Sequence, residues 1–231
     1  MPIPTTQPNP SLSFHTGPLP ADIAAMRRRY EGEGLDEATL PSNPLWLLEQ
    51  WIADAAEAGC LEPNAMALST VDRTGHPRTR FVLCKGVNDV GLRFFTNYES
   101  DKAVELGSRP YASVAFFWDK LERQMRIDGK AHALTRPENE HYFAMRPRES
   151  QLGAWASPQS QPVAGRAELE ALYAEVEARF AGVDVPCPPF WGGYVLVPGR
   201  VEAWQGRPGR LHDRVVWKRA ESGWNLSRLA P

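Results

Sequence analysis

A succession of short segments with β-strand composition constrains the fold of this chain most strongly. Five runs rich in Val, Phe and Trp follow one another between residues 65 and 134: AMALSTV, TRFVLCK, LRFFTN, YASVAFFW and RQMRIDGKAHAL. The connections DRTGHP and GVNDVG carry turn-forming residues. A second group of runs closes the chain: GGYVLV, RVEAWQG, RVVWKR and GWNLSRL. Several strands at this spacing predict an antiparallel sheet or barrel.

Helical patterns lie before and between these strands. Asn43 and Pro44 have the form of an N-cap followed by proline at the first helical position, and apolar residues then recur at helical spacing to about Ala58. Further helices are predicted over about 100–106, 137–155 and 167–180. The last of these carries one apolar stripe that we expect in the core: Leu169, Leu172, Tyr173, Val176 and Phe180. Because no repeat and no obvious linker follows the first twenty residues, we predict a single α+β domain over residues 21–231.

Composition narrows the class of protein. Hydrophobic residues make up 42% of the 231 residues, which is enough for a sizeable core and excludes a wholly disordered chain. The formal net charge of −2, from 26 basic and 28 acidic residues, gives no overall basic surface for nucleic acid or for an anionic membrane. Any anion site must therefore be built locally.

The cysteines and the N-terminal segment bear on the cellular compartment. Cys60, Cys84 and Cys187 are far apart and form no C-x-x-C pair, so neither a disulfide framework nor a structural zinc site is expected. Residues 1–20 are rich in Pro, Ser and Thr and have neither a basic start nor an apolar core, which indicates a disordered tail rather than a signal peptide. No apolar run approaches membrane-spanning length. We therefore expect a soluble, cytoplasmic protein.

The segment RTRFVLCK places two cations on opposite faces of one strand. Side chains alternate along a strand, so Arg80 projects to the face opposite Lys85. On a regular strand these two cations cannot easily bind the same phosphate, but each can serve a different one. From this segment alone, solvated residues at a strand end remain the alternative.

The segment HYFAMRPRESQLGAW contains the side chains of a phosphate site. Tyr142 and Arg146 are four residues apart, and a continuous helix would stack them on one face. Pro147 is expected to end that helix and can start another, which puts Ser150 near a helix N-terminus whose free amides favour an anion. The alternative is a solvated arginine and a serine that only caps the helix.

The segment GRLHDR near the C-terminus combines several functional side chains. His212 and Asp213 suggest either half of a metal site or an acid–base pair, whereas Arg210 and Arg214 suit an anionic ligand. A metal site needs three or four ligands, and none of the five histidines stands in H-x-H or H-E-x-x-H spacing. A nucleophile triad lacks a G-x-S-x-G setting. The remaining interpretations are an ordinary turn at a strand start and an Arg/His group facing an anionic substrate.

The motifs taken together resemble one protein family. The matching segments run in family order from about residue 26 to the C-terminus: MRRRY, RTRFVLCK, FFTNYESDKA, LERQMRIDGKA, YFAMRPRESQLGAWASPQS, FWGGY, EAWQG and RLHDR followed by RLAP. They are similar to the pyridoxine/pyridoxamine 5′-phosphate oxidase family, FMN enzymes that form pyridoxal 5′-phosphate. The resemblance is specific because many segments carry it rather than one motif. It implies a split β-barrel fold and a homodimer with two FMN sites at the subunit interface.

The resemblance also implies the residues of the site. FMN contacts are expected at Arg80, Phe81, Val82, Leu83, Cys84, Lys85, Phe95, Thr96, Lys102, Gln124, Gln159, Ser160, Trp204 and Arg214. The substrate phosphate is expected against Lys85, Tyr142, Arg146 and Ser150. Arg210 and His212 are expected to border the reacting part of the substrate as candidate catalytic residues, and the segment from Arg27 to Tyr30 is expected to close over it. No metal is implied.

The implied reaction is oxidation of pyridoxamine 5′-phosphate and pyridoxine 5′-phosphate by O₂, with hydride transfer from substrate C4′ to flavin N5. It releases H₂O₂, and ammonia from the amine; the cofactor does the redox chemistry, while the protein supplies orientation and charge. One alternative is a related flavin oxidase of phenazine-type biosynthesis, which would not need the substrate-phosphate residues. Another is a non-catalytic carrier of flavin or pyridoxal phosphate. A nucleic-acid-binding barrel would need a basic stripe interleaved with exposed aromatic residues, which the sequence lacks.

One position departs from the family pattern. In FFTNYESDKA the family usually carries an arginine before the lysine, and both help to hold the FMN phosphate, whereas this chain has Asp101 before Lys102. An aspartate cannot donate a hydrogen bond to a phosphate dianion and repels it. Asp101 has an alternative role as the cap of the helix that begins near Ser100. We expect FMN to be held less tightly than the family pattern would give.

Overall fold

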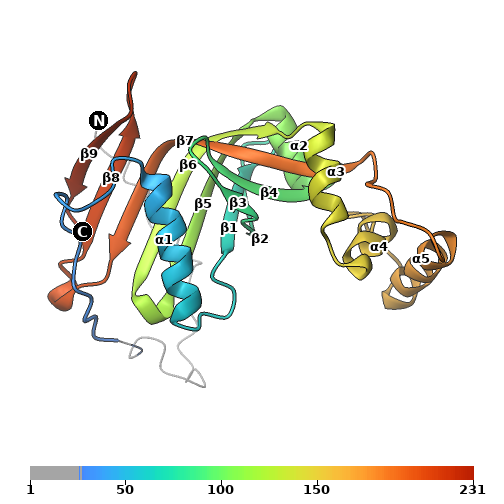
Figure 1. The fold of residues 1–231 in the computed structure, drawn as a ribbon, viewed down its shortest axis with the longest axis horizontal. Coiled ribbons are helices and arrows are strands. Elements are labelled where there is room, and N and C mark those ends of the chain that lie inside the picture. The colour runs from blue at the N-terminus through green and yellow to red at the C-terminus, as the bar shows by residue number, and fades with distance from the viewer. Residues whose placement is uncertain (1–25, 27) are drawn as a thin grey trace, which may run out of the picture.

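The computed structural model describes Met26 and residues 28–231, which form the sheet and helices of Figure 1. The expected tail over residues 1–20 and the candidate residue Arg27 lie outside the described residues. The strands are β1 (Ala65–Val71), β2 (Pro77–Leu83), β3 (Gly86–Val87), β4 (Leu92–Asn97), β5 (Tyr111–Trp118), β6 (Arg123–Ala133), β7 (Trp191–Gln205), β8 (Asp213–Arg219) and β9 (Trp224–Leu229). The α-helices are α1 (Pro44–Glu57), α2 (Asp101–Ser108), α3 (Arg136–Ala144), α4 (Arg148–Ala156) and α5 (Arg166–Arg179).

The strands pair antiparallel in one curled sheet. Their order is β2-β1-β5-β6-β7-β4-β3, with β8 paired to β7 and β9 to β8. α1 lies against one face of this sheet (Figure 1), and its Leu48 and Trp51 join Phe116 and Trp217 in the main core. α1 begins as predicted, because the Asn43 side chain accepts a hydrogen bond from the Leu45 N–H at 3.1 Å. The α+β split-barrel prediction is confirmed.

β7 is a single long strand that crosses the molecule (Figure 1). The sequence suggested two strands here, because Pro198 and Gly199 separate GGYVLV from RVEAWQG. The register of β6 shifts between Asp128 and Gly129, opposite this point, and the irregularity is absorbed without ending the strand. A Cβ on Gly129 would lie 2.3 Å from the Val197 carbonyl oxygen, so this close approach needs glycine. The first half of β7 pairs with β4 and the second half with β8.

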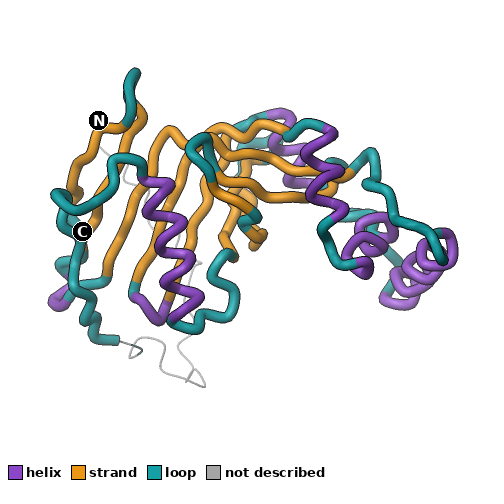
Figure 2. Tube along the Cα trace, in the orientation of Figure 1, coloured by secondary structure: helices purple, strands orange, loops and turns teal. Residues whose placement is uncertain are grey.

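The helical end of the molecule corrects one expectation. The pattern over 137–155 forms two helices, α3 and α4, with the expected break at Pro147. The stripe on α5 is not core, since only Phe180 is buried and the others are half-buried: Leu169, Leu172, Tyr173 and Val176. These side chains stay half-buried because α4 and α5 project from the end of the sheet (Figure 2), so that α5 packs mainly on α4. No helix in the described part of the chain is long and apolar enough to cross a membrane.

Candidate functional site

A half-buried lysine with neutral partners lies at the start of α2. The Lys102 ammonium donates hydrogen bonds to Thr96 Oγ1 at 3.0 Å, Ser100 Oγ at 3.2 Å and Gln159 Oε1 at 2.8 Å. Burial lowers the pKa of Lys102 to about 8, and the charge of Arg80 adds to this effect. Among residues 28–231, no carboxylate pairs directly with this ammonium. A cation that is desolvated in this way beside a second cation is suited to an anionic ligand.

Arg80 extends this cationic group from β2. Its guanidinium lies 3.1 Å from Glu105 Oε2 and also donates to the Thr70 hydroxyl, which in turn donates to Glu105. The neighbouring Phe81 is 78% exposed whereas Arg80 is half-buried, so these two side chains alternate on β2 as expected. β2 ends at Leu83, and Lys85 lies beyond the strand, where it lines a cavity with Tyr142. The structure thus brings Arg80 to α2, on the same side as Lys102.

Ser160 and Asp101 complete the surroundings of Lys102. Ser160 adopts a left-handed φ of 70°, and its hydroxyl accepts a hydrogen bond from the Asp101 N–H at 3.3 Å. The expectation that Asp101 caps α2 is wrong, because Ser100 occupies the N-cap position and Asp101 is the first helical residue. The exposed carboxylate still lies in the first helical turn, where the helix dipole favours a negative charge.

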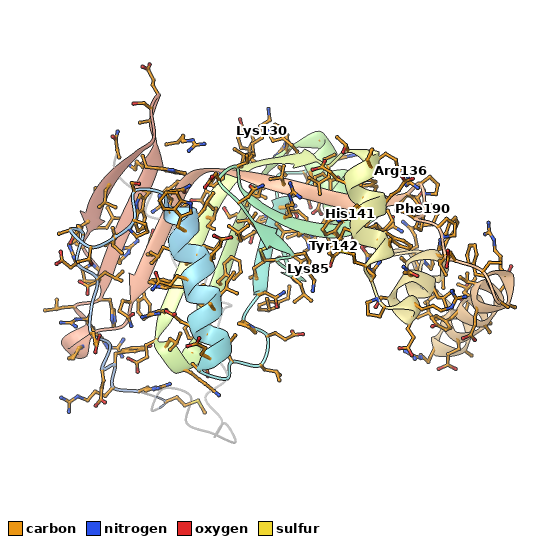
Figure 3. All side chains as sticks on the ribbon, viewed as in Figure 1. Lys85, Lys130, Arg136, His141, Tyr142 and Phe190 are labelled. Atoms are coloured by element: carbon orange, nitrogen blue, oxygen red, sulfur yellow. The ribbon has the colours of Figure 1, made fainter. Side chains whose placement is uncertain are left out.

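The four residues expected around the substrate phosphate line two neighbouring cavities. Lys85 and Tyr142 line a cavity of about 460 Å³ that also contains Arg93 and His141; Figure 3 labels Lys85, His141 and Tyr142 at this site. Arg146 and Ser150 instead line a cavity of about 250 Å³ with Asn97, Gln159 and Trp191. The predicted single cup is therefore divided in this structure.

An aromatic stack lies between the two cavities. The Tyr142 and Phe95 rings are stacked with centroids 3.8 Å apart, and Phe95 is stacked on Trp191 at 5.3 Å. The Arg146 guanidinium lies over Trp191, 4.6 Å from the ring centroid, and its buried Nη1 has no hydrogen-bond partner within the described chain. Burial lowers the pKa of Arg146. An unpartnered guanidinium nitrogen beside a cavity fits an anion that enters it.

The helix geometry expected for Tyr142 and Arg146 is wrong in one respect. α3 ends at Ala144, so Arg146 follows the helix instead of standing one turn beyond Tyr142 on it. Pro147 causes this early end because the residue before a proline is disfavoured in helical conformation. Ser150 lies in the first turn of α4, as predicted.

A second group of expected FMN contacts forms one row across three strands. Gln124 on β6 is paired with Trp204 on β7, which is paired with Arg214 on β8. Arg214 donates through Nε to Glu202 Oε1 at 2.9 Å and through Nη1 to the Ala230 carbonyl at 3.0 Å. Burial alone would raise the pKa of Glu202, but hydrogen bonds from the arginines on either side lower it overall. The carboxylate is therefore charged, and it fixes Arg214.

The segment GRLHDR is divided between two roles. The His212 ring lies 4.8 Å from the Trp204 ring and 5.1 Å from the Tyr30 ring, and its Nδ1 accepts from the Arg207 N–H at 3.1 Å. Asp213 instead accepts from the Leu35 N–H at 3.0 Å and pairs with arginines. The structure gives no support to a His–Asp acid–base pair. Arg210 is exposed at the tip of the loop, with a left-handed φ of 61°.

The two groups of expected FMN contacts lie at opposite ends of β7. Thr96, beside Lys102, is paired with Gly192, and Trp204 stands twelve residues further along the same strand. At 3.3 Å per residue this separation is about 40 Å along the strand, longer than an FMN molecule. Within one chain, therefore, the two groups cannot contact the same flavin.

The motifs of the sequence do not point to two buried carboxylates in these groups, Glu105 and Glu202. Glu105 stands three residues after Lys102, so helical spacing placed it on a neighbouring face of α2. Glu202 stands two residues before Trp204, on the same face of β7. Neither spacing indicates that the carboxylate binds an arginine from another element of the fold. Within the described residues, no group of three or more His, Cys, Asp or Glu side chains is arranged to hold a metal ion.

Comparison with known proteins agrees with the geometry. The curled antiparallel sheet is that of the split-barrel flavin proteins among the solved structures. Residues 52–180 match the family model described as pyridoxamine 5′-phosphate oxidase, and residues 191–231 match the pyridoxine 5′-phosphate oxidase C-terminal dimerisation region. The chain belongs to the pyridoxine/pyridoxamine 5′-phosphate oxidase family and is an oxidoreductase. The match to the dimerisation region supports a homodimer.

Relatives with this name cover nearly the whole chain. The pyridoxine/pyridoxamine 5′-phosphate oxidase of Pseudomonas paraeruginosa is 52% identical over 90% of this chain and 98% of its own. That of Azotobacter vinelandii is 49% identical over 92% and 100%. Among solved structures, PhzG from Burkholderia lata, in complex with tetrahydrophenazine-1-carboxylic acid, has a TM-score of 0.81 at 33% identity over 87% of this chain and 99% of its own. An FMN-binding protein from Nostoc punctiforme, with a TM-score of 0.64 at 19% identity over 78% and 95%, shares the fold.

Proposed function

We propose that this enzyme oxidises pyridoxine 5′-phosphate and pyridoxamine 5′-phosphate with O₂ to pyridoxal 5′-phosphate and H₂O₂. The amine also takes up one water, which supplies the aldehyde oxygen, and releases ammonia. The observation that carries the proposal is the cationic group at α2, where the hydrogen-bond partners of Lys102 among the described residues are all neutral. Its chemistry fits the phosphate of FMN: Lys102 and Arg80 supply charge, and Thr96, Gln159 and Ser160 supply neutral hydrogen-bonding groups. The bound FMN would supply the acceptor for the hydride from substrate C4′ and the route for its electrons to O₂.

A second copy of the chain supplies the other half of each FMN site. Because the row of Gln124, Trp204 and Arg214 is about 40 Å along β7 from the α2 group, one chain supplies half of each FMN site. A two-fold dimer brings the end of β7 in one chain to the α2 group of its partner. Exposed aromatic side chains on the outer face of the sheet favour this contact, since Phe81 is 78% and Phe117 63% exposed.

The substrate phosphate is proposed to bind Lys85, Tyr142, Arg146 and Ser150. The unpartnered Nη1 of Arg146 supplies one charge-assisted hydrogen bond, and Lys85 supplies charge from the adjacent cavity. For one phosphate to contact all four residues, the Tyr142 ring must rotate away from the Phe95 ring. This rotation would join the two cavities. Binding at the phosphate, remote from C4′, then holds the reacting carbon in place.

Arg210 and His212 are proposed to contact the reacting end of the substrate. His212 Nδ1 accepts a backbone N–H, so the neutral imidazole carries its proton on Nε2 and can donate it to a substrate oxygen or nitrogen. Arg210 stands exposed at the loop tip, and its left-handed backbone is the kind of strained conformation found at ligand-binding loops. Tyr30 covers His212 from the N-terminal segment.

A phenazine-type flavin oxidase is the second candidate, favoured by the similarity to PhzG. The substrate-phosphate residues argue against it, because a precursor without a phosphate would leave Lys85 and Arg146 unpaired.

The three free cysteines fit a reducing compartment, and we place the enzyme in the cytoplasm on this ground.

One experiment tests the proposal directly. The purified protein is expected to show a flavin spectrum that bleaches on anaerobic addition of pyridoxamine 5′-phosphate and returns on admission of air. Unphosphorylated pyridoxamine serves as the matched control and should bleach it far more slowly. Bleaching by a dihydrophenazine carboxylate, but not by pyridoxamine 5′-phosphate, would establish the second candidate instead. A flavin that neither compound reduces would leave only the carrier.

A further inference from the structure

Glu122 is a buried carboxylate in an unfavourable backbone conformation. It follows the short helical turn between β5 and β6, has a φ of 55°, and is 7% exposed. Residues with a Cβ rarely adopt a left-handed backbone. Such a residue is held in place by the surrounding structure, and residues of this kind cluster at functional sites. Its carbonyl oxygen is fixed by the Gly206 N–H at 2.8 Å and by the Gln205 side chain at 3.2 Å. The residues at the end of β7 thereby fix the backbone of Glu122.

The carboxylate of Glu122 holds the N-terminal segment. Oε2 accepts the Glu31 N–H at 2.7 Å, and Oε1 lies 3.4 Å from the guanidinium of Arg28. The same guanidinium donates to the Asp119 carbonyl at 3.2 Å. A second attachment follows in the sequence, where Leu35 N–H donates to Asp213. The segment between these two points is therefore fastened to the sheet at both ends.

Tyr30 lies within the fastened segment and faces the candidate catalytic histidine. Its ring meets His212 edge-on at 5.1 Å and Trp204 at 5.6 Å. The Tyr30 ring also packs closely on Gly206, since a Cβ at that position would lie 2.6 Å from Tyr30 Cδ1. The edge of Tyr30 and the Arg207 N–H on Nδ1 together fix the plane of the imidazole and the position of its Nε2.

We propose that Glu122 is a positioning residue that sets Tyr30 against His212 and so orients the imidazole toward the substrate. The inference rests on the proposed function in that His212 borders the reacting carbon. Glu122 does not touch the substrate itself. It acts through the backbone of Glu31, one residue after Tyr30.

Three variants of the full-length FMN enzyme test this inference. Glu122→Ala removes the acceptor, Glu122→Gln keeps an oxygen for the Glu31 N–H but loses the charge toward Arg28, and Glu33→Gln is the matched control. Glu33 is an exposed carboxylate of the same segment. Two readouts do not depend on activity: amide hydrogen exchange at Glu31, and the ring-current-shifted NMR signal of the His212 imidazole.

In Glu122→Ala we expect Glu31 to exchange at least about tenfold faster, because it loses a hydrogen bond to a charged acceptor, and the His212 signal to move toward its unpacked position. Glu122→Gln should lie between Glu122→Ala and the wild type, and Glu33→Gln should match the wild type. Unchanged exchange and an unchanged His212 signal in Glu122→Ala would overturn the proposal. Should Glu122→Ala fail to fold, Glu122→Gln decides by the same two signals.

The kinetic readout separates positioning from stability. In Glu122→Ala the rate of anaerobic flavin reduction at saturating pyridoxamine 5′-phosphate should fall about tenfold, with KM and flavin spectrum nearly unchanged. A lower thermal midpoint with a wild-type reduction rate would show that Glu122 is only structural. If the wild type is not reduced by this substrate, the proposed function fails, whereas the exchange and NMR comparison still tests the contact between Glu122, Tyr30 and His212.

Discussion

FMN affinity should depend on pH through Lys102. In the free protein burial and the neighbouring Arg80 lower the pKa of Lys102 to about 8. A bound phosphate dianion favours the charged ammonium and raises that pKa again. Binding above pH 8 therefore requires uptake of a proton, and affinity is lost as the pH rises through the pKa of the free protein.

The size of the effect follows from this pKa. Below pH 8 Lys102 is already protonated, so the dissociation constant of FMN should be nearly constant between about pH 6.5 and about pH 7.5. Above pH 8 the dissociation constant should rise by up to about tenfold per pH unit, until the pKa of the bound form is reached. Flavin fluorescence quenching at constant ionic strength measures it.

Two substitutions at the same position serve as controls. Lys102→Arg keeps its charge at every pH of the experiment, so its FMN affinity should not change with pH above 8. Lys102→Met should bind weakly, also without this pH dependence. A wild-type dissociation constant that stays level up to about pH 9, or a dependence that persists in Lys102→Arg, would refute the assignment of Lys102 to the FMN phosphate.

Other substitutions test the remaining assignments. Asp101→Arg should tighten FMN binding by about tenfold, most visibly at low salt, because it replaces a repulsive carboxylate with a donor; equal or weaker binding would leave Asp101 without a bearing on the cofactor. Arg146→Ala should raise KM for the phosphorylated substrate about tenfold or more while FMN stays bound, and loss of FMN instead would mean that the residue serves the cofactor. Arg210→Ala and His212→Ala should slow anaerobic flavin reduction more than they weaken substrate binding, and stopped-flow reduction at the wild-type rate in both would make them structural.

The local features of the fold were predictable because they depend on neighbouring residues. The Asn43 cap, the turns and the alternation of Arg80 and Phe81 on β2 follow from backbone geometry over a few positions. The α5 stripe shows the limit of such patterns. Amphipathic spacing identifies the apolar face of a helix, but it does not say whether another element covers that face.

For the candidate site, the sequence predicts a set of residues but not how they are arranged. Asp213 stands next to His212 in sequence, yet it binds Leu35, which is 178 positions away, and that pairing depends on the route of the whole chain. The separation of Lys85 from Arg146 likewise depends on where α3 ends and how the aromatic rings stack between them. Neither property is encoded in a short motif.

The length of β7 has a genetic consequence. Under the proposed dimer, each chain carries one half of two different active sites, because its two groups of expected FMN contacts stand at opposite ends of that strand. A Lys102→Met chain and an Arg214→Ala chain, each defective alone, would form a mixed dimer with one doubly altered site and one unaltered site. Random reassociation of equal amounts should then recover about a quarter of wild-type activity. Two loss-of-function alleles of the same gene would complement each other in one cell, whereas two alleles altered at the same end of β7 would not.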